Sequence, residues 1–122
     1  MSTLKVNTIQ NTSGGSSSTP EQIASGRAKA WINFNGEGSI SIRGSFNCSS
    51  ISDNGTGDYT VNFSTTMGDV NYAAAGICGE NTNDPNRYVG LQSYSATHFR
   101  VATNFPSHQR NDVGFVGLSF FR

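Results

Sequence analysis

Two polar segments near the carboxy-terminal end hold most of the side chains that can bind a ligand. Residues 80–87 and 104–112 combine amides and charged groups with aromatic rings. Aromatic faces beside hydrogen-bonding groups suit sugar rings, and loops on a rigid β scaffold are where binding residues concentrate. Ordinary turn residues would give the same pattern, and that alternative stays open. The predicted saccharide-binding surface consists of Asn83, Asp84, Arg87, Tyr88, Tyr94, Phe105, His108 and Arg110.

Residue types that catalyse hydrolysis are present, but not in the usual arrangements. The chain has no Gly-x-Ser-x-Gly nucleophile elbow, and His98 and His108 are its only imidazoles. Glycosidases need two carboxylates flanking the scissile bond, whereas the acidic residues here lie mostly in expected turns, where Asp bonds the backbone. Asp53 and Asp58 flank the Asn54–Gly55 turn and are interpreted as structural. We therefore predict no enzymatic activity, no cofactor and no metal, while a glycan-cleaving module stays open as an alternative.

The segment from Ala28 to Phe63 has the pattern of antiparallel strands. Apolar residues recur at every second position, and mostly polar residues lie between them. Because side chains alternate faces along a strand, one face is expected in a core and the other in water. Asn35–Gly36 and Asn54–Gly55 accept the positive φ that tight hairpin turns require. Three sets are each expected to share a face: Ala30, Ile32 and Phe34; Ile40, Ile42 and Phe46; and Tyr59, Val61 and Phe63.

Further strands are expected over residues 70–79, 88–94, 98–103 and 113–121, which predicts an antiparallel β-sandwich similar to a jelly roll. Small apolar residues on both faces of 70–79 favour a strand between close layers. The last strand has two apolar faces, with Val116, Leu118 and Phe120 on one. Val113, Phe115 and Phe121 form the other. Leaving that second face in water forfeits roughly 1.5–3 kcal/mol per side chain, so we expect a neighbouring copy to cover it.

The amino-terminal residues differ in composition from the rest of the chain. Residues 1–18 contain few large apolar groups and end in a Gly/Ser-rich linker, which predicts an extended attachment arm. Its apolar residues, the expected contacts with a partner, are Leu4, Val6 and Ile9. Residues 19–27 predict a helical neck of one or two turns, because Thr19 can cap it, Pro20 suits the first turn and Gln22 completes a capping box. Residues 28–122 form the expected β-sandwich head.

Length, charge and cysteine content narrow the class of protein. With 122 residues and a formal net charge of zero, the chain suits one domain, and its scattered basic residues argue against a nucleic-acid partner. No apolar stretch approaches the roughly 20 residues of a membrane-spanning helix. Residues 1–10 lack the layout of a secretory signal, so we expect assembly in a cytosol. Cys48 and Cys78 are then expected to be reduced, and a disulfide would require Cα atoms within roughly 7 Å.

The residues from 28 to 67 also resemble a segment of bacteriophage tail-fibre-like proteins, in particular those of marine phages and cyanophages. The resemblance is carried by the opening Ala28–Gly36, the centre Arg43–Asn47 and the close Ser50–Phe63, together with the start Leu4–Asn11. It covers about half of the chain and ends after Met67.

The resemblance implies a structural protein of the virion, assembled in the host cytoplasm. A homotrimeric tail-fibre, knob or tip component is expected, joined to other virion proteins through residues 1–18 and in contact with host-surface polysaccharide. Two alternatives stay open, a capsid decoration protein and a glycan depolymerase module.

Overall fold

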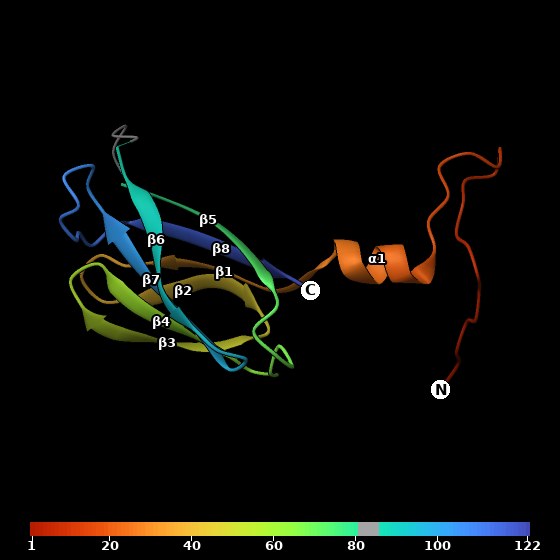
Figure 1. The fold of residues 1–122 in the computed structure, drawn as a ribbon, viewed down its shortest axis with the longest axis horizontal. Coiled ribbons are helices and arrows are strands. Elements are labelled where there is room, and N and C mark those ends of the chain that lie inside the picture. The colour runs from red at the N-terminus through yellow and green to blue at the C-terminus, as the bar shows by residue number, and fades with distance from the viewer. Residues whose placement is uncertain (81–85) are drawn as a thin grey trace.

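The computed structural model describes residues 1–80 and 86–122, which form one short helix and eight strands. Figure 1 shows two stacked sheets with the helix and the preceding residues extending away from one end. The elements are α1 (Pro20–Gly26), β1 (Ala28–Asn35), β2 (Ser41–Phe46), β3 (Cys48–Gly55), β4 (Asp58–Phe63), β5 (Ala73–Gly79), β6 (Tyr88–Tyr94), β7 (His98–Asn104) and β8 (Phe115–Phe121).

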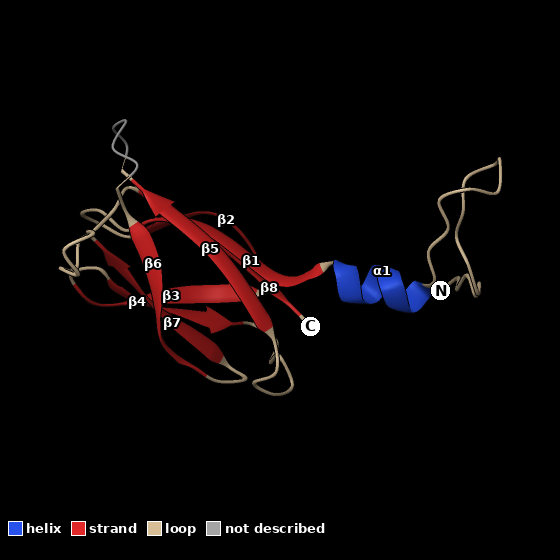
Figure 2. Ribbon diagram, turned by 45° about the horizontal axis from the view of Figure 1, so that its top comes forward, coloured by secondary structure: helices blue, strands red, loops and turns tan. Residues whose placement is uncertain are grey.

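The eight strands form two four-stranded antiparallel sheets. One has the order β2-β1-β8-β5 and the other the order β3-β4-β7-β6. The hairpins β1–β2, β3–β4 and β6–β7 each stay within one sheet, while the other connections cross between sheets (Figure 2). The first and last strands of the sandwich are neighbours, with Ile32 opposite Leu118. The predicted all-β sandwich is therefore confirmed.

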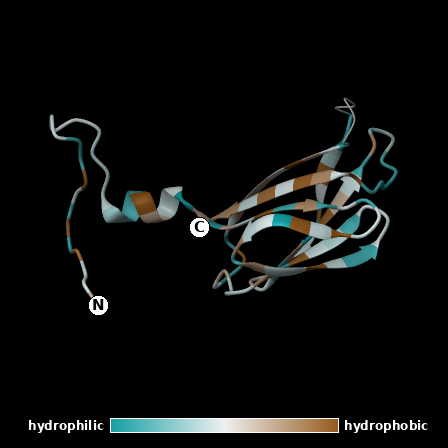
Figure 3. Cartoon of the chain, turned by 180° about the vertical axis from the view of Figure 1, so that it is seen from behind, coloured by the Kyte–Doolittle hydropathy of each residue, from teal (hydrophilic) through white to brown (hydrophobic). Residues whose placement is uncertain are grey.

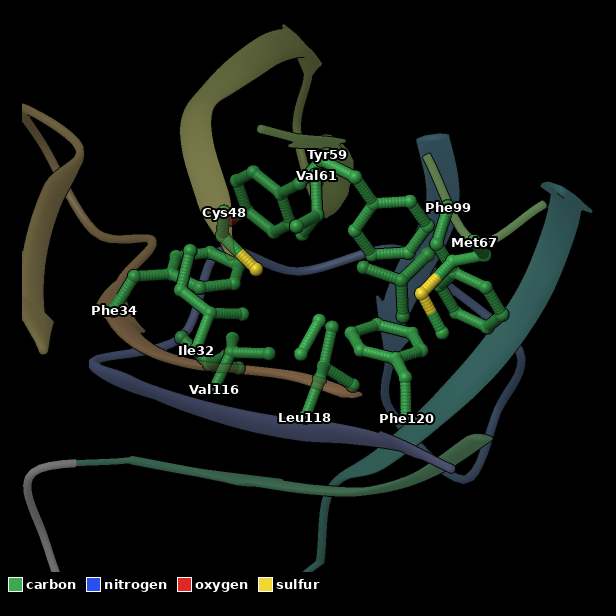
Figure 4. Close-up of a cluster of buried hydrophobic side chains, with 14 residues drawn as sticks. Ile32, Phe34, Cys48, Tyr59, Val61, Met67, Phe99, Val116, Leu118 and Phe120 are labelled. Atoms are coloured by element: carbon green, nitrogen blue, oxygen red, sulfur yellow. The ribbon is translucent and has the colours of Figure 1, made fainter. Parts of the chain in front are cut away.

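The core lies between the sheets and is built mainly from aromatic and β-branched side chains (Figure 4). Phe120 is fully buried and packs edge-on against Phe63 and Phe99, with ring centroids 5.1 Å apart in both cases. Phe34 and Tyr59 form a similar pair at 5.3 Å. Such edge-to-face pairs add about 0.5–1.5 kcal/mol beyond burial, so a few rings stabilise a core that contains little Leu.

The alternation along β1, β4 and β8 is confirmed. Figure 3 shows hydrophobic and polar residues alternating along the strands. The predicted inward sets are buried: Ala30, Ile32 and Phe34; Tyr59, Val61 and Phe63; Val116, Leu118 and Phe120.

Two predictions about facing are wrong. Val113 was expected on the outer face of the last strand, yet it is fully buried in the core, because β8 begins only at Phe115 and Val113 lies in the preceding irregular segment. Phe46 and Ile42 were expected to share a face, but Phe46 is opposite Trp31 and Ile42 is opposite Phe34. Between these pairs β2 contains one extra residue, Arg43, and such a bulge reverses the facing of everything beyond it.

Strand β5 also differs from its prediction. It begins at Ala73 and lies at the edge of its sheet, and its residues from Ala73 to Ile77 are exposed. Its inner face lies near Val89 of β6, and no layer covers its outer face among the described residues. A Cβ added at Gly76 would come within 2.4 Å of the Leu118 side chain, so close packing against β8 explains at least this small residue.

Helix α1 begins as the sequence predicts. The Thr19 side chain accepts from the Gln22 N–H at 3.2 Å, the Gln22 side chain accepts from the Thr19 N–H at 2.9 Å, and Pro20 occupies the first turn. Residues 1–19 lie beyond this helix, away from the sandwich (Figure 1), and contain a single backbone bridge between Ile9 and Ser18.

Both cysteines are free. Cys48 in β3 is buried and its Sγ donates to the Trp31 carbonyl at 3.5 Å, while Cys78 lies in β5 of the other sheet. Burial raises the pKa of each thiol to about 11, so both remain uncharged at neutral pH.

Candidate functional site

Glu80 and residues 86–87 of the first polar segment lie near the second, residues 104–112, at the end of the sandwich opposite α1 (Figure 1). The Glu80 carboxylate joins them, since its Oε1 accepts from Arg87 Nε at 3.0 Å and from Asn111 Nδ2 at 2.9 Å. Arg87 Nη2 lies 2.9 Å from the same oxygen, and both side chains are largely buried. The ion pair therefore links the residue after β5 to the residue before β6, and the Asn111 hydrogen bond ties both to the β7–β8 connection.

Four of the predicted binding residues gather there, and we call Arg87, Tyr88, Phe105 and His108 the loop cluster. The Arg87 guanidinium lies over the Phe105 ring, 4.0 Å from its centroid, in a cation–π contact. The rings of Tyr88 and His108 are 6.2 Å apart and meet edge-on. The cluster thus combines one edge-on ring pair with a third ring that is covered on one face by a guanidinium.

The turn that carries Phe105 and His108 is fixed by its own backbone. Phe105 N–H donates to the Gln109 carbonyl at 2.9 Å, and His108 N–H donates to the Phe105 carbonyl at 3.0 Å. His108 has a φ of 67°, a left-handed conformation that costs a non-glycine residue free energy. The turn therefore presents the imidazole at a defined position on an exposed loop.

Beneath the loop cluster, the turn after β3 packs against the β7–β8 connection. The Asp112 carboxylate accepts from Gly57 N–H at 2.7 Å and lies 2.8 Å from the Tyr59 hydroxyl. The same hydroxyl is 2.9 Å from the Gly36 carbonyl. Burial, together with the adjacent Asp112 carboxylate, raises the pKa of Tyr59 far above its usual range, so the phenol stays protonated as a donor.

Arg110 lies on the outer surface of the β3-β4-β7-β6 sheet, next to the loop cluster. It forms an ion pair with Asp58, and its Nη2 donates to Gln92 Oε1 at 2.8 Å. Asp58 also receives Arg100 Nε and Nη2, both at 2.8 Å. These hydrogen bonds, from Arg100 first and Arg110 second, outweigh burial and lower the pKa of Asp58 to about 2. One ionised carboxylate therefore holds two guanidiniums, which we call the arginine pair.

The other predicted binding residues lie elsewhere. Tyr94 lies at the opposite end of β6, where its ring is 6.1 Å from that of Tyr72, so the structure does not bring it to the loop cluster. Asn83 and Asp84 are outside the described residues.

Sequence reasoning missed several residues that shape this site. Arg100 was not predicted as a binding residue. Its position two residues after His98 places it on the outer face of β7, a strand whose other residues are mostly buried. Asp58 was interpreted as a turn residue only, and its two arginine partners lie 42 and 52 positions further along the chain. Glu80 was assigned only to a polar loop, and no local signal pairs it with Asn111.

The outer face of the other sheet is apolar, and we call it the apolar face. Its large side chains include Trp31, Phe46 and Ile77, which are 42%, 55% and 68% exposed. Phe115 and Phe121, predicted to face outward, lie on this face half-buried. Gly44 and Gly117 lie between the rings and have no side chains that would project from this face. By contrast, the outer face of the β3-β4-β7-β6 sheet carries the arginine pair and a hydrogen-bonded ladder of Ser and Asn side chains.

Comparisons with known proteins do not extend this description. No protein-family model matches the chain, and neither any curated protein nor any solved structure is detectably similar. Within residues 1–80 and 86–122, no group of three or more His, Cys, Asp and Glu side chains is placed to hold a metal ion. The helix found in these residues is not long and apolar enough to cross a bilayer.

Proposed function

We propose that the chain is a structural protein of a bacteriophage particle, a homotrimeric component of a tail fibre, knob or tip that recognises host-surface glycans. The observation that carries the proposal is the contrast between the two outer sheet faces, one apolar and one polar. An apolar face suits burial between identical copies, whereas a polar face suits contact with a hydrated ligand. The resemblance of residues 28–67 to tail-fibre-like proteins is the reason for proposing a location in the virion and an assembly of three copies.

Burial of the apolar face provides the driving force for assembly. Ile77 and Phe46 are the most exposed large side chains in the described part of the sandwich, and Trp31 is 42% exposed. Covering each contributes about 1.5–3 kcal/mol.

Residues 1–18 serve as the attachment arm. Leu4, Val6 and Ile9 are 83%, 37% and 52% exposed, and Ile23 of the adjoining helix is also exposed. These side chains line a shallow groove between the arm and α1, where an apolar segment of another virion protein can dock. The arm and the loop cluster lie at opposite ends of the molecule (Figure 1), so attachment leaves the binding end free.

The loop cluster binds the saccharide. The rings of Phe105, Tyr88 and His108 offer surfaces to apolar sugar C–H groups, and the imidazole nitrogens of His108 bond hydroxyl groups. The Glu80–Arg87 ion pair preorganises these groups, which reduces the entropy lost on binding.

Substitution of Phe105 by Ala tests the saccharide site. We expect a loss of about 1 kcal/mol, or about fivefold in affinity, on host-envelope polysaccharide, because the ring and its support of Arg87 both disappear. Tyr94→Ala is the matched control, since Tyr94 is an exposed ring at the other end of β6. Binding is measured on immobilised polysaccharide, after sedimentation has shown that both variants keep their oligomeric state. Equal affinities of the two variants for the polysaccharide would show that the loop cluster is not the saccharide-binding site.

Immunogold labelling of intact particles tests the place in the virion. Label at fibres or the tail tip is expected. Label on the capsid shell would contradict this proposal and would instead indicate a capsid decoration protein that binds the shell through its arm.

A further inference from the structure

The arginine pair has binding capacity that its internal contacts leave unused. Each guanidinium has five N–H donors. Among the described residues, Arg100 gives Nε and one Nη2 donor to Asp58, while Arg110 gives Nη1 to Asp58 and Nη2 to Gln92. The two side chains are 42% and 41% exposed, whereas the Asp58 side chain is only 3% exposed. Several donors therefore face solvent, while the carboxylate that fixes them does not.

The charge of this group is also unbalanced. One carboxylate faces two guanidiniums, which leaves a net charge of +1 on the surface of the sheet. Asn54 and Thr60, the nearby polar residues on β3 and β4, are neutral and hydrogen-bonded to each other at 2.8 Å. A planar fork of donors with excess positive charge is the arrangement that binds carboxylate and phosphate groups in two-point contacts.

The geometry is preorganised for such a ligand. Arg100 lies on β7, and its guanidinium is held by Asp58, which lies on the neighbouring strand β4 opposite Ala102. The guanidinium therefore needs no rearrangement to bind a ligand. Arg110 follows the turn that carries His108, which places the arginine pair beside the loop cluster. The pair lies on the β3-β4-β7-β6 sheet, so burial of the apolar face on the other sheet leaves it accessible.

We propose that Arg100 and Arg110 bind the oxyanion group of an acidic saccharide, a carboxylate, sulfate or phosphate substituent on a sugar whose ring lies against the loop cluster. The proposal rests on the proposed saccharide recognition and narrows it to anionic polysaccharides. Asp58 is a positioning residue that holds the fork and does not contact the ligand. The polysaccharide of the host surface is then acidic, and its binding weakens as salt concentration rises.

Isothermal titration of the full chain with defined oligosaccharides tests this inference. The probes are an oligogalacturonate, its neutral methyl ester, and a sulfated and a phosphorylated oligosaccharide of similar length. We expect at least one anionic probe to bind at least about tenfold more tightly than the neutral ester, as charge-assisted hydrogen bonds predict. The pattern among the anionic probes identifies the oxyanion.

Arg100→Gln should abolish that preference, and Arg100→Lys should restore it only in part, because Lys keeps the charge and loses the fork. Arg43→Gln is the control, an exposed cation on β2 of the other sheet. Circular dichroism first establishes that each variant is folded at the titration temperature. Equal binding of acidic and neutral probes, or an unchanged preference in Arg100→Gln, would overturn the inference. Neither result would decide whether the chain forms a trimer or where it lies in the virion, because sedimentation and immunogold labelling test those proposals separately.

Discussion

Asp58 illustrates how much of this site depends on single side chains. It is buried on the outer side of β4, and two guanidiniums keep it ionised. The sequence identifies it as a structural residue near a turn, which is correct but incomplete. Its partners come from β7 and from the β7–β8 connection. No local spacing indicates such pairs, because they depend on strand order.

Asp58→Asn should change the pH dependence of stability. The pKa of Asp58 is about 2 in the folded chain and about 4 when unfolded, so its contribution is complete above about pH 4 and is lost as pH falls towards 2. The variant should lose about 1–3 kcal/mol at pH 7, and its stability should decline less between pH 5 and pH 2 than that of the natural chain.

Thermal unfolding monitored by circular dichroism at several pH values measures this difference. Asp53→Asn is the control, since Asp53 is an exposed hairpin residue that accepts from Gly55 N–H at 2.9 Å. Parallel pH curves for the natural chain and Asp58→Asn would show that the arginine pair does not stabilise the carboxylate.

At the scale of elements, the turn between β3 and β4 is the scaffold of the binding end. Gly57 has a φ of +60°, and a Cβ there would lie 2.5 Å from the Thr103 carbonyl oxygen and 2.7 Å from the Asn111 nitrogen. Gly57 carbonyl also accepts from Thr103 N–H at 2.9 Å. The turn therefore packs directly against the backbone that leads into the Phe105–His108 turn.

Gly57→Ala should destabilise the fold by about 1–3 kcal/mol, because both the left-handed backbone and the close approach exclude a side chain. Gly79→Ala is the matched control, since a Cβ there meets no described atom within 4 Å. Chemical denaturation compares the two. Similar midpoints would mean that the turn can move away from the β7–β8 connection at little cost.

The sequence predicts the strands better than it predicts their partners. Alternation correctly identifies the core faces of β1, β4 and β8, because each strand buries one face. It fails at Arg43, where one extra residue reverses β2, and at Val113, which precedes the strand it was assigned to. It also fails for β5, where small residues reflect an edge position beside β8. Bulges, strand starts and sheet edges depend on neighbouring strands, which a single pattern does not record.

In the molecule as a whole, the surfaces to which functions are proposed lie at two ends and on two faces. The arm and α1 extend from one end, and the loop cluster occupies the other (Figure 1). The apolar face and the arginine pair lie on opposite sheets. The proposed assembly, attachment and binding would therefore use different surfaces.

A charge placed on the apolar face should prevent assembly. Phe46→Glu puts a carboxylate where a neighbouring copy would bury a ring 55% exposed in the single chain, and burying an unpaired charge is costly. Ser52→Glu is the control, because Ser52 is exposed on β3 of the polar sheet. Only the first should release single chains, and both should stay folded.

Sedimentation velocity of the natural chain at micromolar concentration measures whether the apolar face drives assembly into trimers. We expect one stable species with about three times the 13.0 kDa mass of a single chain. A species of 13.0 kDa alone would contradict it, since the apolar face would then remain in water without a partner.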